Sequence, residues 1–293
     1  MDILEVLENG IFLPNPKRGD DEEVLLINNY LAFLKKIIEI LTVLPCIVIS
    51  VPILLWYFGI THNKWPFSIF SEIVNLEISV GIQILVQIIT LGGYYFNDIL
   101  YFIFLSHANL HLTNLQNCIK NVIKRSILDY LKENKSCSLC DFEKIEWKYL
   151  RRRLKEIIEY HKAIYEVTKE IDNAFNISQF VHFLSISVVT CFVLYDLSVV
   201  SEINGVLWMD ILFILFLLSE VTAFCFFANE ITTLSFEVGH CCSNLDFVGT
   251  DIRFQKSLLA IIRRSQNPIV FTAGKIIPLT MATALGVRGV AIF

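Results

Sequence analysis

The sequence predicts an all-α, polytopic helical membrane protein with about five transmembrane helices and long cytoplasmic helical extensions. Of the 293 residues, 55% are hydrophobic and only 18% are charged, whereas a soluble domain is about 45–50% apolar and about 25% charged. The mean hydropathy is +0.58. The apolar residues gather into long uncharged runs whose length suits a helix crossing about 30 Å of hydrocarbon. A soluble enzyme core, a disordered chain and a fibrous repeat are therefore disfavoured.

Five segments carry these apolar runs. The first contains Pro45 and Pro52, which are expected to kink it. The fourth is interrupted only by Asp210 and Glu220, and the last contains Lys275 and Arg288. The predicted spans are residues 37–60, 78–105, 173–195, 207–228 and 268–293.

Polar segments separate the spans and complete the predicted organisation. Within the longest of them, apolar residues recur at helical spacing, which predicts two long amphipathic helices between residues 107 and 170. The predicted division begins with a cytoplasmic N-terminal segment (1–36), two spans with a short outer loop (37–106) and a cytoplasmic helical extension (107–172). Two further spans (173–228), a cytoplasmic loop and helix (229–267) and a last, pore-type helix (268–293) complete it.

The positions of lysine and arginine predict the orientation. The segments 1–36, 107–170 and 229–266 contain 4, 13 and 4 of them, whereas the loops 61–72 and 197–206 contain Lys64 alone. Because cytoplasmic loops are enriched in these residues, we expect a cytoplasmic N-terminus and, after five crossings, an extracellular C-terminus. On this topology the acceptor pattern Asn176-Ile177-Ser178 lies at a cytoplasmic end and is expected to carry no glycan.

The C-terminal region carries a motif that resembles a known family. Residues 264–268 read Arg-Ser-Gln-Asn-Pro, and residues 272–275 read Thr-Ala-Gly-Lys. Together they resemble the signature that opens the last helix of insect odorant receptors. Three other stretches agree with this resemblance in the expected order: Trp65-Pro66-Phe67 in an outer loop, Asn97-Asp98 at the end of the second span, and Tyr160-His161 followed by residues 171–175.

The resemblance covers roughly residues 20–283 and implies a subunit of a ligand-gated cation channel. It implies a small volatile odorant as ligand and a heterotetramer with a shared co-receptor in the plasma membrane of sensory neuron dendrites. The family has seven helices, so this chain is expected to hold the counterparts of helices three to seven. It is expected to lack the first two helices and the family's usual C-terminal Ser-Tyr-Ser segment.

Candidate site residues follow from depth, chemistry and the resemblance. An odorant pocket needs aromatic and aliphatic side chains in the outer half of the bundle, although tryptophan and tyrosine there also form interfacial belts. The ligand-binding candidates are Trp56, Tyr57, Phe58, Glu77, Ile78, Ile82, Trp208, Ile211 and Leu212. By resemblance the last helix lines the pore, and the candidates there are Thr272, Lys275, Thr280, Thr283 and Val287. An interfacial anchor is the alternative for Lys275.

Two acidic residues, Asp98 and Glu220, lie within predicted spans. A charged side chain at the centre of a span costs about 2.5–3.5 kcal/mol on insertion scales. We therefore expect Glu220 to face the bundle interior, a partner or a water path. The family tends to carry glutamine there, so a protonated or hydrogen-bonded packing residue is the alternative. His161 and His182 are predicted to be packing histidines.

The sequence predicts no cofactor, no metal site and no enzymatic activity. Cys137 and Cys140 form a single C-x2-C motif without a second cysteine pair, whereas structural zinc needs four ligands. The basic run 151–153 suits a solvated or lipid-facing cytoplasmic helix face, and contact with anionic headgroups or with an acidic subunit surface is its alternative. A nucleic-acid partner would need a concentrated basic face, and the sequence gives no reason to expect one.

Two alternative classes remain beside the odorant-gated channel. One is an incomplete, non-conducting receptor fragment or pseudogene product that inserts in the membrane without activity. The other, a G-protein-coupled receptor, conflicts with the predicted cytoplasmic N-terminus.

Overall fold

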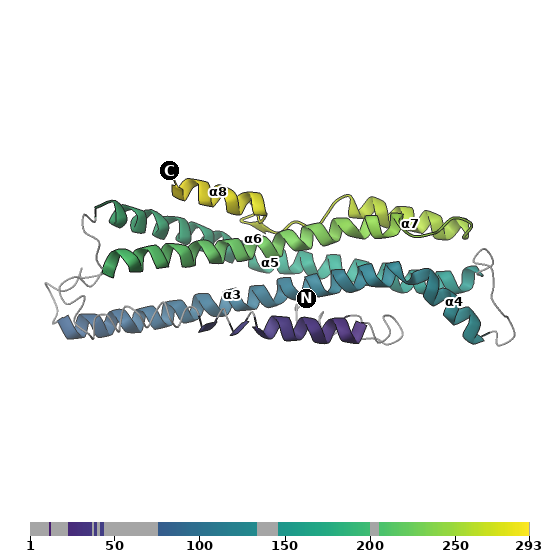
Figure 1. Cartoon of the computed structure of the whole chain (residues 1–293), viewed down its shortest axis with the longest axis horizontal. Helices are drawn as coiled ribbons and strands as arrows, with labels where there is room; N and C mark the ends of the chain where they lie inside the picture. The colour runs from purple at the N-terminus through teal and green to yellow at the C-terminus, as the bar shows by residue number, and fades with distance from the viewer. Residues whose placement is uncertain are drawn as a thin grey trace.

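The chain folds into an elongated bundle of long helices (Figure 1). The computed structural model describes residues 12, 23–36, 38–39, 42–43, 76–133, 146–199 and 205–292. Residues 23–36 form a helix. The elements that follow are α3 (Leu76–Lys120), α4 (Val122–Glu133), α5 (Trp147–Val199), α6 (Gly205–Ser243), α7 (Ile252–Ser265), β1 (Thr272–Ala273), β2 (Ile277–Pro278) and α8 (Met281–Ile292). The predicted all-α class is confirmed.

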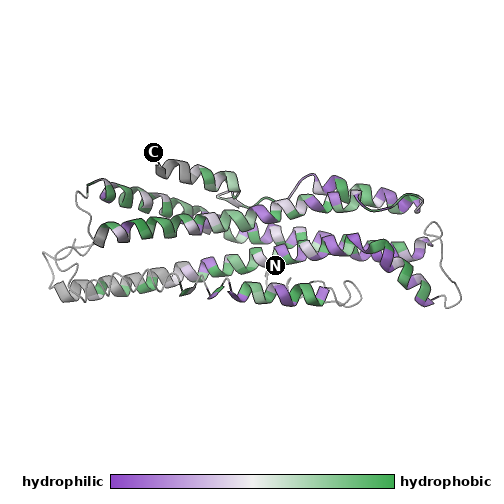
Figure 2. Cartoon of the chain, viewed as in Figure 1, coloured by the Kyte–Doolittle hydropathy of each residue, from purple (hydrophilic) through white to green (hydrophobic). Residues whose placement is uncertain are grey.

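Hydropathy divides the bundle along its length, with apolar residues concentrated toward one end of α5 and α6 and polar residues toward the other (Figure 2). Within the described part of the chain, α5 and the stretch Asp210–Ser243 of α6 are each apolar enough to cross a membrane. Only 22% and 39% of their most apolar windows are buried. Apolar side chains such as Phe192 and Leu212 face outward, so this end of the bundle presents a surface suited to lipid.

The long helices run without a break through the predicted boundaries at residues 106, 172 and 228. The polar segment 107–170 was predicted to hold two long amphipathic helices, and the bounds of the helices differ from that prediction because α3 and α5 extend beyond the segment. The described part of this segment consists of the end of α3, the whole of α4 and the first part of α5. The stretch 147–199 contains neither glycine nor proline, so no residue in it favours ending the helix where the surroundings change from polar to apolar.

The last predicted span is a helix only in its C-terminal part. Residues 268–280 form an irregular segment that contains the antiparallel hairpin of β1 and β2, and α8 begins at Met281. The prediction of a helix from residue 268 is therefore wrong for these residues. Gly274 and Lys275 both adopt positive φ angles at the tip of the hairpin, and Pro278 would distort a continuous helix.

An aromatic core joins the long helices at mid-length. The rings of Phe102 on α3 and Phe224 on α6 stack with centroids 4.6 Å apart. The ring centroid of Tyr101 lies 5.1 Å from that of Phe175 on α5 and 6.4 Å from that of Phe271, which precedes β1. Tyr101, Phe224 and Phe271 are almost completely buried. The core therefore contacts three helices and the segment that leads to α8.

In the polar half, side-chain hydrogen bonds join α3 to its neighbours. Asn109 donates to the Glu230 carboxylate at 2.9 Å, and Gln116 donates to the backbone carbonyl of Leu234 at 3.0 Å. His111 and the hydroxyl of Tyr160 on α5 lie 2.6 Å apart. These contacts connect α3 to both α5 and α6.

His161 also lies in the polar half of the bundle. Burial and the nearby Arg264 guanidinium lower the pKa of His161 to about 4. The ring is therefore neutral at pH 7, as expected of a packing histidine.

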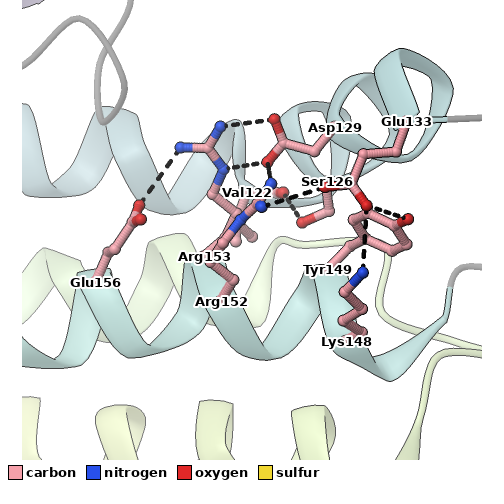
Figure 3. Close-up of polar contacts among 9 residues, drawn as sticks. All are labelled: Val122, Ser126, Asp129, Glu133, Lys148, Tyr149, Arg152, Arg153 and Glu156. Carbon is pink, nitrogen blue, oxygen red and sulfur yellow. Dashed lines mark hydrogen bonds and ion pairs between the residues drawn. The ribbon is translucent and has the colours of Figure 1, made fainter.

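The basic run 151–153 has an acidic partner within the chain. Arg153 donates two hydrogen bonds to the carboxylate of Asp129 on α4, at 2.7 and 2.9 Å, and Arg152 lies 2.8 Å from the same carboxylate (Figure 3). Tyr149 donates to Glu133 at 2.8 Å in the same network. The Asp129 and Arg153 side chains are 9% and 14% exposed, so this ion pair is largely shielded from water. It fixes α4 against α5.

Replacing Asp129 by Asn is expected to destabilise the purified chain by about 2 kcal/mol, because hydrogen bonds between charged groups contribute about 1.5–3 kcal/mol. The matched control is Glu159→Gln. It removes an exposed ion pair with Lys155 and is expected to change stability by less than about 0.5 kcal/mol. Thermal unfolding in detergent measures both. Equal melting temperatures for the two variants would contradict this role of the network.

The same pair predicts a pH dependence. Burial raises the pKa of Asp129, but hydrogen bonds from Arg153 and Arg152 lower it by more, so this pKa lies below its ordinary value. The stabilisation is therefore complete above the unfolded pKa of about 3.9 and is lost as the pH falls through the lower pKa of the folded chain. The difference in Tm between wild type and Asp129→Asn is expected to stay constant from pH 7 to about pH 5 and to shrink in more acidic solution. A difference in Tm between wild type and Asp129→Asn that grows on acidification would contradict a lowered pKa of Asp129 in the folded chain.

Candidate functional site

The segment between α7 and α8 is held first by α6. The hydroxyl of Thr232 donates to the carbonyl of Ile269 at 2.8 Å, and the backbone N–H of Ile269 donates to the hydroxyl of Ser235 at 3.0 Å. Ser235 is fully buried. Both backbone groups of Ile269 are thus satisfied by α6, which fixes the direction in which the chain approaches β1.

Two side chains of α5 then bind Thr272 of β1. The Asp172 carboxylate accepts hydrogen bonds from the backbone N–H of Thr272 at 2.8 Å and from its hydroxyl at 3.3 Å. The Asn176 amide donates to the hydroxyl and to the carbonyl of Thr272, at 2.9 and 3.1 Å. We call Asp172, Asn176 and Thr272 the anchor. It satisfies every polar group of Thr272 and joins α5 to the final segment.

The turn of the hairpin fits closely against α5. The N–H of Gly274 donates to the backbone carbonyl of Asn176 at 3.1 Å. Gly274 has a φ of +65°, and a Cβ at this position would lie 2.7 Å from the ring of Phe180. A glycine is required here for both reasons, because other residues are strained at positive φ and the ring leaves no space for a side chain.

Helix α8 begins directly after the hairpin. The backbone N–H of Thr283 donates to the Thr280 hydroxyl at 3.3 Å, and the Thr283 hydroxyl donates to the carbonyl of Pro278 at 2.6 Å. Thr280 thus caps the N-terminus of the helix. Helix α8 packs against α6, and Ala284 is buried. The anchor and this cap together set where α8 starts.

The five predicted pore-lining residues do not share one helix. Thr272 lies in the anchor, the exposed Lys275 lies at the tip of the hairpin, and Thr280 caps α8. Only Thr283 and Val287 belong to α8, and the side chain of Val287 lies outside the described residues. Because Thr283 and Val287 are four residues apart, they share one helix face.

The predicted ligand-binding residues are only partly described. Trp56, Tyr57 and Phe58 lie outside the described residues, as do the side chains of Glu77 and Ile78. Ile82, Trp208 and Leu212 are more than half exposed, and Ile211 is half-buried. None of these four residues lines the apolar groove on the far part of α5. This groove has a volume of about 580 Å³ and is lined by Ser187, Val188, Cys191, Phe192 and Tyr195.

The predicted intramembrane acids, Asp98 and Glu220, meet inside the bundle. Asp98 of α3, His182 of α5 and Glu220 of α6 bring their ligand-type atoms within 4.8 Å of one another. The Nε2 atom of His182 lies 3.7 Å from Oε1 of Glu220. We call these three residues the polar cluster. The expectation that Glu220 faces the bundle interior agrees with its 14% side-chain exposure.

The sequence of the chain matches a family of known proteins. The sequence profile of the 7tm odorant receptor family matches residues 13–290. The chain belongs to the odorant receptor family. The resemblance noted in the sequence is thereby confirmed.

Individual odorant receptors resemble parts of this chain. It is 29% identical over 132 residues to Odorant receptor 67a of Drosophila melanogaster, and the aligned region makes up 45% of this chain and 32% of that protein. It is 28% identical over 128 residues to Odorant receptor Or2 of Anopheles gambiae, and the aligned region makes up 44% of this chain and 34% of that protein. The aligned parts thus span about a third of these relatives.

Solved structures share the fold over nearly the whole chain. The insect olfactory receptor OR5 from Machilis hrabei matches with a TM-score of 0.76 and 16% identity, over 99% of this chain and 72% of that one. The same receptor in complex with eugenol matches with a TM-score of 0.75 and 15% identity. At such identities the match establishes the fold.

Sequence reasoning missed the residues that form the anchor on α5. Asp172 was noted only within a family-like run, and Asn176 only within a glycosylation pattern. Phe180 carried no signal, and His182 was predicted only to pack. Their partners lie far along the chain, about 100 residues for Asp172 and Thr272. Only the adjacent Thr-Ala-Gly-Lys motif marked one side of the contact in advance.

The close fit at Gly274 predicts the effect of adding one methyl group. Gly274→Ala is expected to destabilise the chain by about 1–3 kcal/mol, because it combines positive-φ strain with a clash against Phe180. Adding Phe180→Leu should recover the part of this loss that comes from the clash. Thermal unfolding of the single and double variants measures the coupling.

Gly286→Ala is the matched control, since nothing lies within 4 Å of a Cβ there. This change is expected to leave stability unchanged or slightly raised, because alanine favours a helix more than glycine does. A Gly274→Ala variant as stable as wild type would contradict the described hairpin.

Proposed function

We propose that this chain is an odorant receptor subunit in which a small volatile odorant opens a cation channel formed with a shared co-receptor. The observation that carries the proposal is the family match over residues 13–290. The fold shared with a solved insect olfactory receptor supports it, since that receptor binds eugenol in one of its structures.

The ligand would bind in the apolar end of the bundle. The groove beside Val188, Phe192 and Tyr195 on α5 has the apolar lining that small volatile molecules favour. We propose that the ligand also contacts the residues predicted from the sequence at this end of the bundle, which are Trp56, Tyr57, Phe58, Glu77, Ile82, Trp208, Ile211 and Leu212. The ligand would favour channel opening only through a higher affinity for the open arrangement.

Helix α5 offers a physical connection between the ligand and the pore. It carries the groove at residues 187–195, Phe180 against the hairpin, and the anchor at Asp172 and Asn176. No glycine or proline interrupts it between these points, so the helix can move as one rigid element. A shift of α5 would pull β1 and reposition the N-terminus of α8, on which we propose that Thr283 and Val287 line the pore.

The proposed assembly is a heterotetramer with the co-receptor in the plasma membrane of sensory dendrites. The N-terminus would lie in the cytoplasm and the C-terminus outside. Several apolar side chains of the polar half are exposed, among them Ile252 and Leu259 of α7. We propose that this part of the chain contacts other subunits.

Recording odorant-evoked current from cells that express this chain with the co-receptor tests the proposal. A panel of small volatile compounds is expected to evoke inward cation current that cells expressing the co-receptor alone do not show. Normal surface expression of the chain without such current would overturn the proposal and favour a non-conducting membrane polypeptide.

The anchor supplies a variant for the same recordings. Asp172→Ala leaves the Thr272 N–H without its acceptor and is expected to reduce the evoked current at unchanged surface level. Glu170→Ala, which removes an exposed carboxylate two residues earlier on α5, is the control and should leave the current unchanged.

A further inference from the structure

The polar cluster brings together donor groups from three helices. Asp98 and His182 are 5% and 6% exposed, and the potential ligand atoms of the cluster all lie within 4.8 Å of one another. The cluster thus combines one imidazole and two carboxylates in a space that largely excludes water. Two acidic side chains rarely share such a space unless a proton or a cation lies between them.

The spacing suits a metal ion. Zinc binds histidine nitrogen and carboxylate oxygen at about 2.0–2.2 Å, so the ligands of a tetrahedral ion lie about 3.4 Å apart. The observed separation of 3.7 Å between His182 Nε2 and Glu220 Oε1 is close to that value. The other ligand-type atoms of the cluster lie no more than 4.8 Å from one another, so small side-chain rotations would bring them to the tetrahedral spacing.

The surroundings support the same interpretation. The Asn97 amide donates to the Asp98 carboxylate at 3.4 Å, and the Ser178 hydroxyl donates to the Asn97 carbonyl oxygen at 3.1 Å. Such outer contacts orient ligands in metal sites. The ring of Phe224 lies edge-on to His182, with centroids 5.6 Å apart, and shields the cluster on that side.

We propose that Asp98, His182 and Glu220 form a binding site for a divalent transition metal ion of the zinc type. An imidazole ligand favours zinc and its neighbours over magnesium or calcium, which prefer six or more oxygen ligands. Two carboxylates neutralise the charge of the ion, so the bound site adds no net charge inside the membrane. Three protein ligands leave a fourth position for water.

The position of the site gives it a structural consequence. His182 lies on α5 between the anchor at Asn176 and the groove that begins at Ser187. A bound ion would cross-link α3, α5 and α6 at this level. It would thereby stabilise one arrangement of the three helices.

Metal binding to the purified full chain tests the site without any channel recording. After treatment with a chelator, the chain is titrated with Co²⁺, whose visible absorption reports tetrahedral coordination, and then with Zn²⁺ as competitor. One Co²⁺ per chain is expected, displaced by Zn²⁺. Asp98→Asn, His182→Gln and Glu220→Gln should each weaken binding at least about tenfold.

Matched controls separate the cluster from other side chains of the same types. Asp210→Asn removes another acid of α6, and His240→Gln removes an exposed histidine of the same helix. Both should bind Co²⁺ as wild type does. Glu220→His replaces one ligand by another and should retain binding with an altered spectrum, a result that a purely structural hydrogen bond would not produce.

Thermal unfolding of each variant shows whether it is folded before binding is compared. The proposal is overturned if wild type shows no saturable Co²⁺ spectrum, or if folded variants of all three cluster residues bind as wild type does. Loss of binding on Glu220→His as complete as on Glu220→Gln would also count against it.

Discussion

The hydrogen bonds between Asp172, Asn176 and Thr272 are the contact on which the arrangement of the final segment depends. Thr272 is neither in a long helix nor exposed to solvent on all sides, so its polar groups need partners within the protein. Helix α5 supplies all of them, and α6 does the same for Ile269. Removing one partner would leave a poorly solvated donor or acceptor, which costs more than the bond itself contributes. The position of α8 thus depends on the side chains of two other helices.

These contacts can fix α8 because α3, α5 and α6 are long and continuous. Helices α5 and α6 pass from an apolar to a polar part without a break (Figure 2). The two parts are held by different forces. In the middle, stacked aromatic rings around Tyr101 and Phe224 exclude solvent. In the polar part, hydrogen bonds such as Gln116 to Leu234 and the ion pair of Asp129 with Arg153 set the register of neighbouring helices. A displacement at one end of α5 would therefore reach the other end.

The polar cluster and the anchor illustrate two ways in which a membrane protein accommodates polar groups. In the anchor every hydrogen-bonding group of Thr272 has a neutral or anionic partner close to the polar part of the bundle. In the cluster two carboxylates and an imidazole converge among aromatic residues, where an uncompensated charge would be costly. A divalent ion would remove that cost, and the same three residues would then join the helices between the apolar groove and the anchor.

Composition and the spacing of apolar residues predicted the class of this protein, because uncharged runs of about 20 residues have the length of a helix that crosses a membrane. The motif at residues 264–275 identified the family without any tertiary information. The tertiary structure alone decided what lies beside what. Thr272 and Asp172 are about 100 residues apart, and Asp98, His182 and Glu220 come from three helices. The prediction of a helix from residue 268 was wrong. The backbone groups of Ile269, Thr272 and Gly274 form hydrogen bonds with α5 and α6 instead, and Pro278 disfavours a continuous helix. Local sequence encodes which segments become helices, whereas the partners of buried polar groups depend on packing between distant segments.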